Sequence, residues 1–314
     1  MMIDVKQVLR RGSGVLAVML LGLVCGQALG TTQPENGARE VVETPKLVVV
    51  IAIDQLRRDR LFESSEAGLG RLKHAGRVFT AGQLAHGITT TCPGHAAIMT
   101  GLNPDGHGLP SNSFLDRATG KVQYCVGSDD PAHQVLGGSK GRSPSNLRAD
   151  ALGDWLKAKN PKHRVFAVSA KDRAAVTLAG VNPDGVYWYD VAQGRFTTSG
   201  YYQDQLPQYL RTFNGQDPAV DGFMQGFPER WTHSADGARA DDYEGEDTRY
   251  ERVSGHPLMQ GTFEDIAKQV YASPFIDEAT MELAQLMLIE EAIGQGAAMD
   301  LLSISLSATD TVGH

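Results

Sequence analysis

The sequence predicts an α/β fold in which a mostly parallel central sheet is sandwiched between helices. Short apolar runs rich in β-branched residues alternate along the chain with segments that place apolar residues at helical spacing. Strands that alternate with helices pair in parallel, and their crossover helices cover both faces of the sheet. Strands are expected at residues 47–53, 164–168, 185–189 and 300–306, and helices at residues 65–75, 93–100, 145–158 and 277–293.

Residues 1–30 have the pattern of a secretory signal peptide. Basic residues precede an apolar stretch at 15–24, and a small-x-small cleavage site ends at Gly30. That stretch is too short to cross a bilayer, so we expect a periplasmic or secreted protein with no transmembrane span after signal removal. Cys25 follows a valine rather than a small residue, so lipoprotein anchoring there is not expected. Residues 31–45 lack periodicity and predict a flexible leader.

The run at 47–53 is apolar throughout, which predicts a strand buried on both faces. Asp54 follows it directly. In open α/β sheets ligands bind at the carboxyl ends of the strands, so Asp54 is a candidate metal ligand. The alternative is that Asp54 only caps a turn. The helix expected next, at 65–75, ends at Gly76.

Thr91 stands at the mouth of the helix expected at 93–100, which Pro93 begins and Gly101 ends. The free amides and the positive dipole end of such a helix point at this threonine. Both favour negative charge, so the position suits a nucleophile that attacks phosphorus and then carries a covalent phosphate. Threonine is also a common helix N-cap, which is the purely structural alternative.

The helix at 145–158 is predicted because Leu147, Ala151 and Trp155 would share one of its faces. From 195 to 262 the composition becomes polar and rich in turn residues. This change predicts an insertion or cap beside the active site.

The strand at 164–168 leads into a charged turn that contains Lys171 and Arg173. A phosphate monoester dianion needs cationic partners, and this pair offers a point charge together with a planar fork of donors. The alternative is a solvated turn with no ligand.

The last predicted helix, 277–293, is expected to be capped by Asp277. The strand at 300–306 follows, and beyond it Asp310 and His314 are four residues apart. That spacing brings both side chains to one face of a helical turn, where a carboxylate and an imidazole could bind one zinc. A surface ion pair is the alternative.

Four ordered segments together resemble the alkaline phosphatase superfamily, in the branch that shares its sequence pattern with type I phosphodiesterases and nucleotide pyrophosphatases. The segments are the strand ending in Asp54, residues 91–95 leading to Gly101, residues 103–108 with Asn112 beyond them, and residues 309–314. The resemblance covers roughly residues 46–314 and implies an alkaline-phosphatase-like fold.

The resemblance also implies two zinc ions. Asp54 would be a ligand of one zinc, to which Thr91 would bridge as the nucleophile, while Asp310 and His314 would hold the second. Members of the family continue beyond this point with an Asp-His pair and a later histidine that complete the two sites. Neither has a match here, so we expect incomplete metal sites and a C-terminally truncated chain.

The phosphoryl group would be bound by the side-chain amide of Asn112 and the backbone amide of Cys92. Lys171 and Arg173 resemble the lysine and arginine of the threonine-type alkaline phosphatases, which act on monoesters. We therefore expect a zinc-dependent alkaline phosphatase that works through a phospho-threonine. A phosphodiesterase or nucleotide pyrophosphatase of the same superfamily, or an inactive truncated relative, is the alternative.

Sulfatases of the superfamily are excluded by chemistry, because the threonine at position 91 cannot become a formylglycine. The formal net charge of −8 gives no support for a nucleic-acid partner, so small-molecule phosphate esters are the expected ligands. Cys92 and Cys125 could form a disulfide in an oxidising compartment, or Cys92 could remain a buried free thiol. The sequence leaves these two possibilities open.

Overall fold

The computed structural model describes residues 44–63, 68–232, 251 and 253–313. The expected signal peptide and nearly all of the leader lie outside the described residues, as does His314. Within the described ranges, no helix combines the length and apolarity that crossing a bilayer requires.

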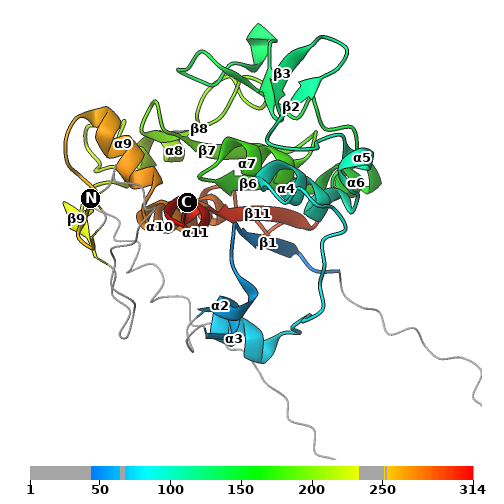
Figure 1. Cartoon of the computed structure of the whole chain (residues 1–314), viewed down its shortest axis with the longest axis horizontal. Coiled ribbons are helices and arrows are strands. Elements are labelled where there is room, and N and C mark those ends of the chain that lie inside the picture. The colour runs from blue at the N-terminus through cyan, green and yellow to red at the C-terminus, as the bar shows by residue number, and fades with distance from the viewer. Residues whose placement is uncertain (1–43, 64–67, 233–250, 252, 314) are drawn as a thin grey trace, which may run out of the picture. The chain divides into compact units, whose positions relative to one another are not determined.

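A five-stranded sheet lies at the centre of the described chain (Figure 1). Its strands, in spatial order, are β1 (Leu47–Ile53), β11 (Asp300–Leu306), β6 (Arg164–Ser169), β7 (Gly185–Asp190) and β8 (Arg195–Thr197). The first four run parallel, and β8 pairs with β7 in the antiparallel sense. Ile53 pairs with Leu306, and Ser305 pairs with Ser169. This register brings the carboxyl ends of β1, β11 and β6 to the same edge of the sheet.

The remaining elements connect or cover these strands. The helices are α2 (Arg58–Glu63), α3 (Gly68–Ala75), α4 (Thr91–Thr100), α5 (Pro104–His107), α6 (Leu152–Lys159), α7 (Asp172–Ala179), α8 (Gln208–Phe213), α9 (Phe263–Tyr271), α10 (Phe275–Glu290) and α11 (Ala308–Val312), with one 3-10 turn at Pro131–His133. Short two-stranded pairs are formed by β2 (Ser113–Asp116) with β3 (Lys121–Tyr124), by β4 (Gly127–Ser128) with β5 (Gly141–Arg142), and by β9 (Arg230–Trp231) with β10 (His256–Pro257).

Helices pack on both faces of the sheet, as the α/β prediction requires. Phe166 and Val168 of β6 join a buried cluster with side chains of α10 on one face. Val165 and Ala167 point the other way and pack with side chains of α4 and α7. The alternation along β6 follows from the two-residue period of a strand. A mostly parallel sheet between helices is thereby confirmed.

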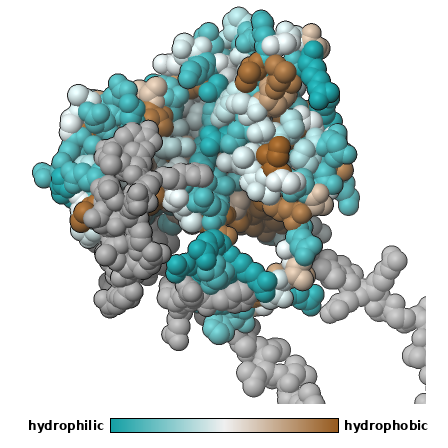
Figure 2. All heavy atoms as spheres, viewed as in Figure 1, coloured by the Kyte–Doolittle hydropathy of each residue, from teal (hydrophilic) through white to brown (hydrophobic). Residues whose placement is uncertain are grey.

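Strand positions agree with the sequence to within one residue, but the burial of β1 does not. It lies at the edge of the described sheet, and its residues Val49 and Ile51 are 44% and 45% exposed. Apolar atoms gather on the surface in Figure 2 where β1 runs in Figure 1. A continuous apolar run therefore marked a strand correctly without fixing how many of its faces are covered.

Two of the predicted helices have boundaries that differ from the structure in ways that change the role of a named residue. The helix expected at 145–158 begins only at Leu152, because Ala151 has an extended backbone and the residues before it form turns. As a result Trp155 is half-exposed instead of sharing a buried face with Leu147 and Ala151. The helix expected at 277–293 begins at Phe275, which places Asp277 inside its first turn and not at its cap.

The expected insertion begins within the sheet, since β8 pairs with β7. Residues 233–250 and 252 lie outside the described residues. The cap therefore stays a prediction.

A buried ion pair ties the amino ends of β6 and β11 to the end of α10. Arg164 donates to Asp300 from Nε (3.1 Å) and from Nη2 (2.6 Å), and also donates to the Glu291 carbonyl (2.8 Å). The backbone amide of Gly294 donates to the same carboxylate at 2.7 Å. Burial alone would raise the pKa of Asp300, but the hydrogen bonds from Arg164 and Gly294 outweigh it and hold that pKa below its ordinary value.

Asp300→Asn should lower the free energy of unfolding by about 2–3 kcal/mol at pH 7, because it leaves Arg164 without its charged partner. The folded-state pKa of Asp300 is depressed, so its contribution is complete above the unfolded value of 3.8 and is lost as pH falls through the folded value. Urea denaturation at several pH values measures both. Glu264→Gln, which breaks an exposed pair with Lys268, is the control and should cost under about 1 kcal/mol. An Asp300→Asn variant as stable as the parent at pH 7 would show that the pair contributes nothing.

Candidate active site

Four candidate residues converge at the sheet edge where β1, β11 and β6 end. Asp54 follows β1, and its backbone amide donates to the Leu306 carbonyl at 2.9 Å. Lys171 lies two residues after β6, at the N-cap of α7. Asp310 lies in the short helix α11 that follows β11, and Thr91 begins α4. The strand register therefore assembles side chains that are far apart in the sequence.

The ammonium of Lys171 lies between two carboxylates. Its side chain is buried, only 2% exposed, and its Nζ donates to Asp54 Oδ2 at 2.5 Å and to Asp310 Oδ2 as well. Burial would raise the pKa of Asp54, but hydrogen bonds and attraction from Lys171 outweigh it and lower that pKa below its usual value. Asp54 is therefore ionised at neutral pH. The sequence placed Lys171 in a charged turn, whereas the structure buries it at the start of a helix.

Thr91 contacts the Asp54 carboxylate from helix α4. It is buried, it is the first residue of α4, and its Oγ1 donates to Asp54 Oδ2 at 3.1 Å. The N-cap is Thr90, which has an extended backbone and whose side chain makes no capping hydrogen bond. The helix thus begins two residues earlier than Pro93 indicated. The hydroxyl lies at the helix N-terminus, as predicted for a nucleophile.

His95, one turn further along α4, joins this helix to the sheet. Its Nδ1 lies 2.9 Å from the Thr91 carbonyl oxygen and its Nε2 lies 2.8 Å from Ser305 Oγ. A carbonyl can only accept, so Nδ1 carries the proton and the serine hydroxyl donates to Nε2. Burial lowers the pKa of His95, which agrees with this neutral form. The sequence analysis included His95 only within the segment 91–95, although its four-residue spacing from Thr91 could have indicated the contact.

Asn112 is oriented by the residue that follows the nucleophile. Its side-chain Oδ1 accepts a hydrogen bond from the Cys92 backbone amide at 2.9 Å. The amide nitrogen of the asparagine keeps its donors for another acceptor. In the structure the Cys92 amide orients Asn112. Its predicted contact with a phosphate oxygen stays a prediction. Cys92 and Cys125 form a disulfide with their Cα atoms 6.5 Å apart, which is the first of the two possibilities left open by the sequence.

Arg173 lies in the first turn of α7, two residues after Lys171. Its Nη1 donates to the Tyr124 hydroxyl at 3.5 Å, and the Tyr271 phenol from α9 also lies within electrostatic range. Its Nε is buried and has no hydrogen-bond acceptor among the described residues. A buried donor without an acceptor is costly, and an anionic ligand oxygen would satisfy it.

Asp277 was expected to cap its own helix, but it caps another. Its carboxylate accepts hydrogen bonds from the backbone amides of Ser307 (2.6 Å) and Ala308 (3.0 Å). These amides open α11, so Asp277 fixes the short helix that carries Asp310. The contact spans some thirty residues, and no local spacing could have revealed it.

The carboxylates of Asp54 and Asp310 flank the buried Lys171 ammonium, and the Thr91 hydroxyl contacts Asp54. Such a set of hard oxygen ligands fits a divalent metal. The described part of the chain contains no cluster of three or more His, Cys, Asp and Glu side chains placed to hold one. The fourth predicted ligand, His314, lies outside the described residues.

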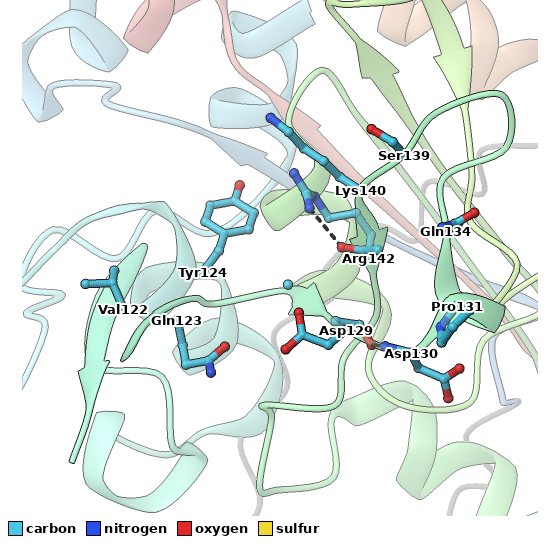
Figure 3. A pocket seen from close by; sticks show the side chains of 13 residues that line it. Val122, Gln123, Tyr124, Asp129, Asp130, Pro131, Gln134, Ser139, Lys140 and Arg142 are labelled. Atoms are coloured by element: carbon cyan, nitrogen blue, oxygen red, sulfur yellow. Dashed lines mark hydrogen bonds between the residues drawn. The ribbon is translucent and has the colours of Figure 1, made fainter. Parts of the chain in front are cut away.

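A polar pocket of about 390 Å³ opens between β3 and the segment from β4 to β5 (Figure 3). Gln123, Asp129 and Lys140 contribute to its lining. Two further lining residues, Tyr124 and Arg142, also contact Asp172, the residue between Lys171 and Arg173 in the sequence. The pocket therefore borders the segment at the start of α7 that contains Lys171 and Arg173.

Comparisons with known proteins show which family and which structures the chain resembles. Residues 48–314 match the model of the family described as type I phosphodiesterase / nucleotide pyrophosphatase. The chain is 31% identical to alkaline phosphatase PafA of Elizabethkingia meningoseptica, over 94% of this chain and 55% of that protein. It is 32% identical to alkaline phosphatase PhoV of Synechococcus elongatus, over 88% of this chain and 52% of that protein. The chain thus spans about half the length of these relatives.

The crystal structure of PafA superposes on the chain with a TM-score of 0.72 at 29% identity, covering 87% of this chain and 55% of PafA. A PafA variant with one threonine, one asparagine, one lysine and one arginine replaced gives a TM-score of 0.71 at 28% identity, with the same coverage.

His95→Leu should lower the free energy of unfolding by roughly 2–3 kcal/mol, since it leaves the buried Ser305 hydroxyl without its acceptor and removes the second hydrogen bond to the Thr91 carbonyl. His95→Asn should lose less, because an amide nitrogen can still donate to that carbonyl. Chemical denaturation of the two variants and the parent checks this order. Equal losses in both variants would mean that packing, and not hydrogen bonding, is what His95 contributes.

Proposed function

Because the chain belongs to the type I phosphodiesterase / nucleotide pyrophosphatase family, within the alkaline phosphatase superfamily, we propose that it is a metal-dependent phosphatase that hydrolyses phosphate monoesters. The observation that carries the proposal is the contact between the Thr91 hydroxyl and Asp54, at the amino end of a helix and beside the buried ammonium of Lys171. A hydroxyl in this position lies beside a carboxylate, the positive end of a helix dipole and a cation, and such an environment suits phosphoryl transfer.

The reaction would proceed in two displacements. In the first, Thr91 Oγ1 forms a bond to phosphorus as the bond to the leaving oxygen breaks, giving a phospho-threonine and an alcohol. In the second, water attacks phosphorus, the bond to Oγ1 breaks, and inorganic phosphate leaves. The positive end of the α4 dipole favours the charge that develops on the phosphoryl group in both steps.

Asp54, Thr91 and Asp310, with His314 beyond the described residues, would hold the metal, which we propose to be two zinc ions. When bound, zinc would supply the positive charge that favours the threonine alkoxide and stabilises the leaving oxygen. Phosphate esters small enough to enter the site are the proposed substrates. We retain export through residues 1–30 as part of the proposal.

Recognition of the phosphoryl group would fall to Asn112 and Arg173. The Asn112 amide nitrogen is free to donate because its oxygen is taken by the Cys92 amide. Arg173 offers a charged fork with a buried unpaired Nε. Lys171 offsets one of the two negative charges of Asp54 and Asp310 in the structure, and we propose its ammonium as the second cationic partner of the dianion.

The four residue types replaced in the PafA variant support this assignment. Its threonine and asparagine are 21 residues apart, as are Thr91 and Asn112, and its lysine and arginine are two apart, as are Lys171 and Arg173. The proposal favours a monoesterase over a diesterase because a monoester carries the additional charge that an arginine can bind.

Thr91→Ala should reduce monoester turnover by about 10³-fold or more, because the nucleophile is removed. Folding should be almost unaffected, since Thr91 donates a single hydrogen bond to Asp54. Steady-state kinetics and thermal unfolding of the full chain loaded with zinc measure the two effects. Thr90→Ala is the matched control, because that side chain makes no capping hydrogen bond. If Thr90→Ala abolishes turnover and Thr91→Ala does not, the nucleophile is assigned wrongly.

Arg173→Ala should depress kcat/KM for a phosphate monoester by about tenfold or more, and for a diester by much less. The loss of a charge-assisted hydrogen bond costs roughly 1.5–3 kcal/mol, and about 1.4 kcal/mol corresponds to a factor of ten. Only the monoester presents the extra charged oxygen. Paired aryl monoester and diester substrates provide the measurement, and equal losses on both would remove the reason to prefer a monoesterase.

A further inference from the structure

We infer that Tyr124, working through Asp172 and Arg142, positions the guanidinium of Arg173 for monoester recognition. The inference rests on the proposed function, because it assigns a purpose to residues around the proposed phosphate-binding arginine. It concerns side chains from the hairpin β2–β3 and from β5, neither of which supplies the nucleophile or a metal ligand.

Asp172 is the centre of the arrangement. Its Oδ1 accepts hydrogen bonds from the Tyr124 hydroxyl (2.6 Å) and from the Arg173 backbone amide (2.7 Å). Its Oδ2 accepts from Arg142 Nε. The side chains of Asp172 and Arg142 are only 15% and 16% exposed, so this ion pair is largely shielded from water. The carboxylate thus has a fixed orientation at the start of α7.

The direction of each hydrogen bond follows from what each group can do. An ionised carboxylate only accepts, so the Tyr124 hydroxyl must donate its single proton to Asp172. The phenol oxygen then offers a lone pair, and Arg173 Nη1 donates to it at 3.5 Å. Burial, followed by the charge of Asp172, raises the pKa of Tyr124, so the phenol keeps that proton. Tyr124 consequently contacts one nitrogen of Arg173, while Nε has no acceptor among the residues that the structure describes.

Arg142 secures the tyrosine ring itself. Its guanidinium carbon lies 4.8 Å from the centroid of the Tyr124 ring, and its Nη1 donates to the Gly141 carbonyl at 2.8 Å. A cation over the ring face limits the rotation of the ring. Figure 3 shows Tyr124 and Arg142 on the two walls of the same pocket.

The hairpin base links this arrangement to the rest of the site. Asn112 comes directly before β2, Tyr124 ends β3, and Cys125 follows with its disulfide to Cys92. The Cys125 amide donates to the Asn112 carbonyl at 2.9 Å and closes the base. One structural unit therefore sets the positions of the proposed phosphate-binding asparagine and of the residue that holds Arg173.

Tyr124→Phe tests the inference, because it removes the hydroxyl and keeps the ring on which Arg142 packs. In the full chain loaded with zinc, kcat/KM for a monoester should fall by about fivefold to tenfold, with less than about a twofold change for a diester. In an Arg173→Ala background the same substitution should change monoester kcat/KM by less than about twofold, since the group it positions is gone.

Tyr201→Phe is the matched control. It removes another phenol hydroxyl, which donates to the Val181 carbonyl at 2.9 Å, and it should leave the ratio of monoester to diester activity unchanged. Thermal unfolding of every variant confirms that each is folded. Equal losses on both esters, or the same loss with and without Arg173, would overturn the inference and make Tyr124 a structural residue.

The affinity for inorganic phosphate, measured by calorimetry, separates this inference from the proposed function. If the parent protein hydrolyses no monoester, the proposed function fails, but the binding test still applies. Tyr124→Phe should then weaken phosphate binding severalfold in the parent and not in Arg173→Ala. Unchanged phosphate affinity in Tyr124→Phe would overturn the inference whatever the activity.

Discussion

The candidate site depends on one buried ammonium placed between two carboxylates. Asp54 ends β1 and Asp310 follows β11, so these acids meet only if the strands pair in register. Two anions cannot be packed together away from water without a cation, and Lys171, which follows β6, supplies it. The ion triad therefore ties the three strand ends together. The carboxylate oxygens of this triad would also favour a cation of higher charge than the ammonium of Lys171.

Around this centre, each proposed functional group is held by a second group that does no chemistry. His95 fixes the first turn of α4 against β11, and Asp277 fixes the turn that carries Asp310. The Cys92 amide orients Asn112, and Tyr124 holds one edge of the guanidinium of Arg173. Precise placement of this kind is what phosphoryl transfer requires, because the protein contributes mainly position and charge.

The sequence could predict the features that depend on local pattern. Apolar runs located four strands to within a residue, and a polar side chain after a strand or before a helix marked Asp54 and Thr91. It could not predict contacts between distant segments, so the roles of Asp277 and Tyr124 were missed. Nor could it show that Lys171 would pair with both Asp54 and Asp310, because a Lys-Asp-Arg segment has the same sequence pattern whether its side chains are exposed or buried. Helix starts failed where loop residues happened to continue an apolar period.

The disulfide between Cys92 and Cys125 makes the ordering of the site depend on the redox environment of the chain. It closes a loop with a sequence separation of 33 that contains Asn112 and the hairpin. By chain-entropy reasoning such a closure stabilises the folded state by about 3–4 kcal/mol. In a reducing cytosol the chain would have to order this loop without that help, whereas an oxidising compartment provides it. Oxidative folding and the ordering of the loop that carries Asn112 would then be a single event.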